Sequence, residues 1–139
     1  MLQPCISIYR DIKAGFYLVQ PYTEGPVACT AFGEPTIIAP EEFTAKVADA
    51  VLANLAKFGK EKYDRSRAKR LSPSEQSKFL KQHLGVSVER LESGDLGIYA
   101  LHHERGGMVG SDEDAIILRE SDIPHKLTDA IAEAFKRAS

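Results

Sequence analysis

The sequence predicts a single α+β domain over residues 1–139, with a mostly antiparallel sheet and about three helices packed on it. The chain has 139 residues and 43% of them are hydrophobic, values that are ordinary for one globular domain. Short apolar runs bounded by glycine or proline outnumber the stretches with helical spacing. Such runs, with only a few helices between them, are typical of an antiparallel sheet with helices on it.

The first strands are expected between residues 6 and 38. Isoleucines alternate with polar residues from Ile6 to Ile12, which is the period of a half-buried strand. The next apolar run, 15–21, begins with a glycine and is predicted to end at Pro21. Two further short strands are expected over residues 27–32 and 36–38.

Helical spacing occurs in three places. Apolar residues recur every three or four positions over 43–58, and Gly59 ends this helix. The sequence Ser72-Pro73-Ser74-Glu75 matches a capping box and opens a second helix, which is expected to stop at Gly85. A third helix begins near Pro124 and turns three apolar residues inward, at Leu127, Ile131 and Phe135.

The remaining strands follow the second helix. Strands over 86–91 and 98–102 flank the turn Ser93-Gly94-Asp95, so they are predicted to form a hairpin. Residues 106–110 are rich in glycine and are expected to form a flexible hairpin loop. The apolar run 115–118 supplies the last strand.

The sequence also indicates where in the cell the protein is located. No apolar run approaches the ~18 residues that a membrane-spanning helix requires, and the first residues lack the pattern of a secretion signal. Cys5 and Cys29 are therefore expected to be reduced thiols in strands. The sequence predicts a cytoplasmic protein without a membrane partner.

The net charge of −2 hides a strong asymmetry along the chain. Residues 60–90 hold nine basic and four acidic side chains, whereas residues 91–139 hold five basic and ten acidic ones. A surface polarised in this way favours fast and selective association with a charged partner.

The run His102-His103-Glu104-Arg105 is the strongest candidate for catalysis, since histidine serves as a general base near neutral pH. Adjacent residues of a strand point to opposite faces, so His102 and His103 are not expected to line one pocket. We therefore predict no catalytic residue, although a small enzyme that uses one of these histidines remains an alternative.

Two other kinds of site, for a metal and for a phosphate group, come into question at the glycine-rich loop. His103 is followed by three acidic residues at 112–114, but nothing in their spacing holds them at metal-ligand distances. Residues 106–110 lack the lysine of a phosphate-binding loop and precede acidic side chains that would repel phosphate. We expect neither a metal nor a cofactor.

A basic segment over residues 60–70 suits a nucleic-acid backbone or an acidic protein face. Glu61 and Asp64 interrupt it, which favours a solvated connection between two helices. We do not expect nucleic acid to be the partner. A small nucleic-acid-binding module that uses this segment is the alternative function. The basic side chains of this segment are Lys60, Lys62, Arg65, Arg67, Lys69 and Arg70.

Acidic residues gather around the turns that flank the predicted strands of the second half. We expect them to cluster in the fold and to form a patch for a strongly basic protein, such as the active cleft of a nuclease. The predicted contact residues are Glu92, Asp95, Glu104, Asp112, Glu113 and Asp114.

The arrangement resembles the immunity proteins of bacterial contact-dependent growth inhibition systems. The resemblance spans nearly the whole chain and is carried by hydrophobic positions and glycines. Its segments are the strand 15–21, the helix ending at 52–55, the helix with Phe79-Leu80-Lys81, the strands 86–91 and 98–102, the glycine-rich loop, the strand 115–118 and the closing helix with 130–135.

This resemblance implies a binding protein and not an enzyme. Such immunity proteins bind and neutralise the toxic C-terminal domain, often a nuclease, that a neighbouring cell delivers. The family implies no fixed contact residues, so the contact residues above come from charge alone.

Overall fold

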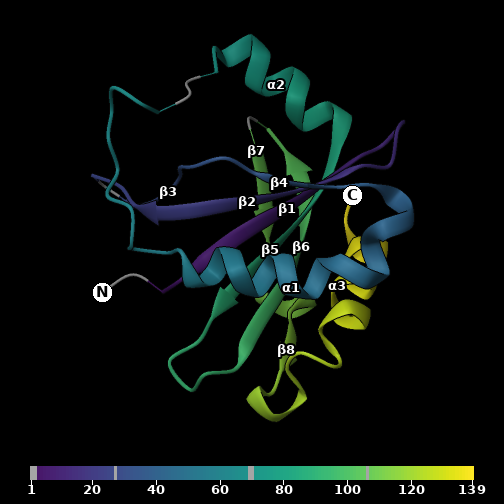
Figure 1. Cartoon of the computed structure of the whole chain (residues 1–139). Helices are drawn as coiled ribbons and strands as arrows, with labels where there is room; N and C mark the ends of the chain where they lie inside the picture. Colours follow the sequence, from purple (N-terminus) through teal and green to yellow (C-terminus); the bar gives the residue numbers. More distant parts are fainter. Residues whose placement is uncertain (1–2, 27, 69–70, 106) are drawn as a thin grey trace.

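The computed structural model describes residues 3–26, 28–68, 71–105 and 107–139. Within them the chain forms an eight-stranded antiparallel sheet and three α-helices, so the predicted α+β class is confirmed. The strand order is β3-β2-β1-β5-β6-β7, and two short strands complete the edges, with β4 beside β2 and β8 beside β6 (Figure 1).

The elements lie close to their predicted positions. The strands are β1 (Cys5–Asp11), β2 (Tyr17–Glu24), β3 (Cys29–Ala31), β4 (Thr36–Ile38), β5 (His83–Arg90), β6 (Leu96–Glu104), β7 (Gly107–Gly110) and β8 (Ile116–Leu118). The helices are α1 (Phe43–Ala56), α2 (Pro73–Gln82) and α3 (Leu127–Arg137), with single turns of 3₁₀ helix at η1 (Pro40–Glu42), η2 (Asp112–Asp114) and η3 (Glu120–Asp122).

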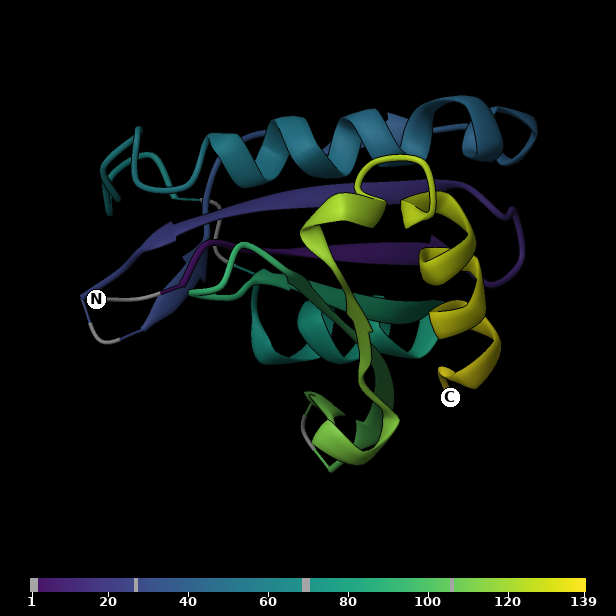
Figure 2. The same ribbon diagram turned by 90° about the horizontal axis from the view of Figure 1, so that it is seen from below.

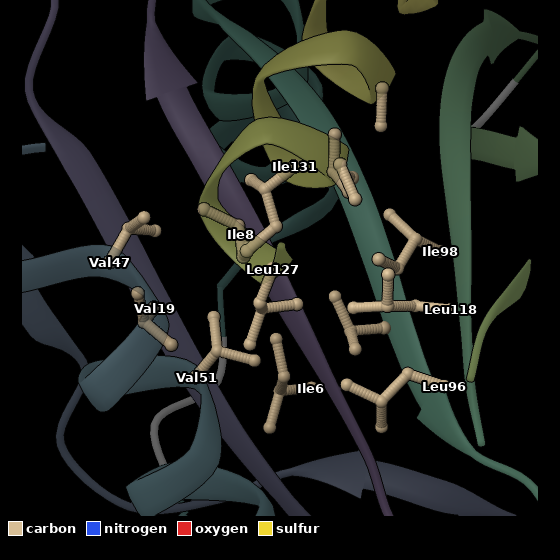
Figure 3. Close-up of a cluster of buried hydrophobic side chains, with 14 of the residues drawn as sticks. Ile6, Ile8, Val19, Val47, Val51, Leu96, Ile98, Leu118, Leu127 and Ile131 are labelled. Atoms are coloured by element: carbon tan, nitrogen blue, oxygen red, sulfur yellow. The ribbon is translucent and has the colours of Figure 1, made fainter. Parts of the chain in front are cut away.

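Helices α1 and α3 cover one side of the sheet, which we call the inner face, and α2 lies on the opposite side, the outer face (Figure 2). Side chains of the inner face and of both helices meet in one apolar core (Figure 3). Its fully buried members include Ile6, Ile8, Val19, Val47, Val51, Leu96, Ile98, Leu127 and Ile131. Each such side chain stabilises the fold by roughly 1.5–3 kcal/mol relative to its exposed state.

Only part of the outer face is covered. Helix α2 has no buried residue and packs through Phe79, whose ring meets Tyr9 edge-on at 5.1 Å and stacks on His83 at 4.0 Å between ring centroids. The predicted capping box is present, since Ser72 Oγ accepts from the Glu75 amide and the Glu75 carboxylate accepts from the Ser72 amide. Helix α2 is thus well formed but shallowly attached.

Pro21 does not end its strand, contrary to the prediction. Strand β2 continues to Glu24 because it changes partner along its length. Its first residues pair with β4 and its last residues, from Tyr22, pair with β3. Pro21 lies between these two partners, where its missing amide hydrogen removes no bond of either ladder.

Two glycine-based predictions were also wrong. Gly85 does not stop α2 but lies inside β5, where an added β-carbon would stand 2.9 Å from both Leu101 and Met108. Residues 107–110 of the expected flexible loop form β7, paired with the end of β6. The strand expected over 27–32 narrows to β3, and Val27 and Gly106 lie outside the described residues.

Candidate protein-binding surface

The structure distributes the six predicted acidic residues along strand β6 and does not gather them all in one cluster. Glu92 and Asp95 lie in the turn before β6, while Glu104 lies at its far end, roughly 25 Å away for a nine-residue strand. The η2 residues 112–114 lie beside the middle of β6, between β7 and β8. Glu104 is therefore separated from the turn residues.

A long-range hydrogen bond brings one further acidic residue, Glu120, to the turn before β6. The Glu120 amide donates to Asp95 Oδ1 at 2.9 Å, and a β-carbon on Gly94 would stand 2.7 Å from Glu120 Oε2. Glu92, Asp95 and Glu120 together make the turn group. Glu120 is 25 residues from Asp95 in the chain, so no spacing in the sequence could have indicated this contact.

The second acidic group, the η2 group, consists of Asp112, Glu113 and Asp114. Ser111 Oγ accepts from the Glu113 amide at 3.2 Å and so caps this turn. Asp114 Oδ2 lies 3.2 Å from His102 Nε2, and Arg137 Nη1 donates to the Asp114 carbonyl. Asp114 is thus tied to its neighbours, whereas the side chains of Asp112 and Glu113 are exposed.

Strand β8 joins the two acidic groups, because η2 precedes it and η3, which begins with Glu120, follows it. It is an edge strand that pairs with β6. Its central residue, Ile117, lies opposite Gly97 and is 54% exposed. An edge strand offers unpaired backbone groups to a partner, and here one acidic group precedes the strand and the other follows it.

Tyr99 lies beside these groups on the outer face. Partial burial, followed by the nearby carboxylates of Glu89 and Asp112, raises the pKa of the Tyr99 hydroxyl above its ordinary value. Its ring lies over Gly97, since a β-carbon there would stand 2.5 Å from the Tyr99 hydroxyl oxygen. No local pattern pointed to Tyr99, because its two acidic neighbours come from other elements.

His102 and His103 both reach the same residue, although they leave opposite faces of β6. His102 Nδ1 lies 2.7 Å from Ser139 Oγ, and His103 Nδ1 lies 2.7 Å from the Ser139 carbonyl oxygen. His103 Nε2 also bonds the Leu80 carbonyl of α2. The two rings hold the chain after α3 against β6. Both histidines therefore have a structural role in this contact.

The basic segment is partly bound to the sheet. Arg67 pairs with Glu61 at 3.0 Å and lies over the ring of Phe32, which in turn contacts Tyr63 at 5.5 Å. Thr23 Oγ1 donates to the Glu61 carbonyl at 2.7 Å. Of the other predicted residues, Lys60, Lys62 and Arg65 are exposed, while Lys69 and Arg70 lie outside the described residues.

A cavity of about 390 Å³ opens between α2 and the outer face. Ser7 Oγ donates to the Tyr22 hydroxyl at 3.0 Å in its wall, and burial raises the pKa of Tyr22 strongly. Burial also raises the pKa of the Cys5 thiol to about 12, with the neighbouring Cys29 adding to the effect. Both cysteines are unpaired.

The described residues hold neither a metal-ligand cluster nor a membrane-spanning helix. Among them, no group of three or more histidine, cysteine, aspartate or glutamate side chains is arranged to hold a metal ion. Across the same part of the chain, none of the helices is both long and apolar enough to pass through a lipid bilayer.

Comparison with known proteins identifies a solved structure with the same fold. Neither a protein-family model nor a curated protein matches this sequence. Among solved structures, the chain is similar to a protein of unknown function from Neisseria meningitidis, with a TM-score of 0.73 and 15% sequence identity. The match covers 99% of this chain and 96% of the other. At this identity the likeness shows a shared fold.

Proposed function

We propose that this protein is an immunity protein that binds and neutralises the toxic C-terminal domain of a contact-dependent growth inhibition system. The toxin domain would be a nuclease with a basic surface, and the encounter would take place in the cytoplasm of the protected cell. The observation that carries the proposal is the β8 edge, where exposed Ile117 stands between the turn group and the η2 group.

This arrangement suits a basic protein partner for physical reasons. Protein interfaces combine an apolar core with a polar rim, and the β8 edge offers Ile117 for the first and the two acidic groups for the second. Complementary charge speeds capture and discriminates against other partners. An immunity protein also needs very tight binding, with a Kd of nanomolar or below, which corresponds to about −12 kcal/mol.

The direct test is calorimetry of this protein with the toxic domain encoded immediately upstream of its gene, together with a growth-protection assay. We expect one-to-one binding at nanomolar Kd or below, and protection of cells that express the toxin. Absence of binding to that domain would contradict the proposal.

The contact surface is tested by charge reversal. Asp112→Lys with Glu113→Lys leaves the Asp114–His102 contact in place, so the fold should persist while association slows at least tenfold. The matched control is Lys62→Glu with Arg65→Glu on the exposed part of the basic segment. If only the control variant loses affinity for the toxin domain, the basic segment is the contact surface and the acidic groups are not.

The same control addresses nucleic-acid binding by the basic segment. If the chain binds nucleic acid there, a gel shift should weaken steeply with added salt and should disappear in the Lys62→Glu, Arg65→Glu variant. Binding that requires this segment would favour the alternative function over the immunity role.

A further inference from the structure

The outer face of the sheet ends at β8 in a cross-strand row of four residues. Strand pairing places Cys5 opposite Glu89, Glu89 opposite Gly97, and Gly97 opposite Ile117. Tyr99 belongs to the next row and leans back over Gly97. Because glycine has no side chain, the hydroxyl end of the Tyr99 ring can lie close against the backbone at this point.

Two acidic side chains lie near this ring, and one of them, Glu89, is paired with Gly97 beneath the tyrosine hydroxyl. The carboxylate of Glu89 comes from β5 and that of Asp112 from η2, and both are near enough to act on the Tyr99 hydroxyl. Ile117 adds an exposed apolar surface next to Gly97. The ring, the two carboxylates and the isoleucine therefore form one small surface, which we call the Tyr99 platform.

Helix α2 does not cover the Tyr99 platform. It packs over Tyr9 and His83, and its hydrogen bond to β6 is made at His103, four residues beyond Tyr99. Figure 1 shows α2 and β8 at opposite ends of the sheet. Tyr99 is half-buried and Ile117 is exposed, so a partner can reach both side chains.

We propose that the Tyr99 platform binds an arginine side chain of the partner protein. A guanidinium group lies flat on an aromatic ring, attracted by the negative face of its π-system, and pairs with carboxylates at the same time. Glu89 and Asp112 supply these carboxylates, and Ile117 contacts the aliphatic part of the arginine. This inference rests on the proposed function for the identity of the partner.

The charges on the platform favour this occupant over others. Two carboxylates beside the ring repel acidic and phosphate groups, and an apolar side chain alone would leave the carboxylates without a partner. Arginine is preferred to lysine because its planar group can stack and donate to two carboxylates at once.

The test measures calorimetric affinity for the upstream toxin domain. Tyr99→Ala should weaken binding about 30-fold, as is typical of an aromatic residue at the centre of an interface. Tyr99→Phe keeps the ring and should stay within about threefold of the wild type. Glu89→Gln with Asp112→Asn should weaken binding at least tenfold, and more at low salt than at high salt.

The matched control is Tyr63→Ala, which removes a half-buried tyrosine in the basic segment. Urea unfolding of each variant establishes that the fold persists. If the wild type and the Tyr99→Ala variant bind the toxin domain equally well, the Tyr99 platform is not an arginine site. The proposed function would be unaffected by this result.

A second measurement does not depend on the toxin. Hexa-arginine and hexa-lysine peptides are titrated into ¹⁵N-labelled protein, and the amide signals of Gly97, Tyr99 and Ile117 are followed. We expect shifts at these amides with hexa-arginine and clearly smaller ones with hexa-lysine. Failure of the toxin to bind, with these shifts present, would reject the proposed function alone, and absence of the shifts would reject the arginine site.

Discussion

Tyr99 and Gly97 fit together so closely that the tyrosine hydroxyl lies 2.5 Å from the place of a β-carbon on the glycine. Gly97 is buried, and an ordinary residue at this position would meet the ring. The close approach holds the ring against the sheet, near the carboxylates of Glu89 and Asp112.

Gly97→Ala is predicted to lower the free energy of unfolding by about 1 kcal/mol, because the new methyl group must displace the Tyr99 ring. The same substitution should cost nothing in a Tyr99→Ala background. Urea unfolding of the four proteins in this double-mutant cycle measures the coupling. Gly107→Ala is the control, since a β-carbon there meets nothing within 4 Å.

Ile98→Ala is predicted to lower the free energy of unfolding by about 2–5 kcal/mol, because Ile98 is fully buried in the core and its removal leaves a cavity. Ile117→Ala deletes the same atoms from the exposed edge strand and should change stability by less than about 0.5 kcal/mol. Chemical denaturation compares the two variants. Similar losses in both would contradict the assignment of the inner face as the core.

Ser72→Ala is predicted to destabilise α2 by about 1 kcal/mol, because the Glu75 amide then loses its acceptor at the start of the helix. Ser77→Ala makes the same change at an exposed position inside the helix and should be neutral or slightly stabilising. Amide hydrogen exchange over residues 73–82 reports the effect even if global unfolding does not. Equal exchange rates in the two variants would argue against the cap.

The capping box should also make α2 sensitive to pH. Hydrogen bonds from Ser72 lower the pKa of the Glu75 carboxyl below its ordinary value of 4.5. This contribution is present above pH 4.5 and is lost as the pH falls through the lowered pKa. The exchange protection of α2 should therefore decline in acid, relative to a Glu75→Gln variant. Parallel pH profiles for the two proteins would contradict this role of Glu75.

Cys5 is predicted to be a poorly reactive thiol. A pKa raised to about 12 leaves very little thiolate at pH 8, so alkylation by iodoacetamide should be on the order of 100-fold slower than for Cys5 in the urea-unfolded chain. Mass spectrometry of the peptide that contains Cys5 follows the reaction. Rapid labelling in the folded protein would show that the thiol is more accessible than its position indicates.

Local patterns predicted most of the secondary structure. The capping box joins Ser72 to Glu75 within one turn of helix, and the inward face of α1 recurs from Val47 to Val51 to Leu55. Such patterns are readable because one helical turn or one strand pleat fixes which side chains share a face.

The errors arose where a distant partner decided the outcome. Pro21 remains in a strand because β4 pairs with the residues before it and β3 pairs with the residues after it. Residues 107–110 form β7 because they pair with the end of β6. Neither partner is visible in the local spacing. The acidic cluster was predicted from turns alone, and the fold moved Glu104 away from it while adding Glu120.

The sequence by itself determined the α+β class, the three helices, most strands and the acidic character of the second half, since these depend on composition and on short-range periodicity. Only the tertiary structure decided that Tyr99, Gly97 and Ile117 share one surface with Glu89 and Asp112. These residues come from four different elements. Their meeting depends on strand order and register, which are set by the packing of the whole sheet and not by any single segment.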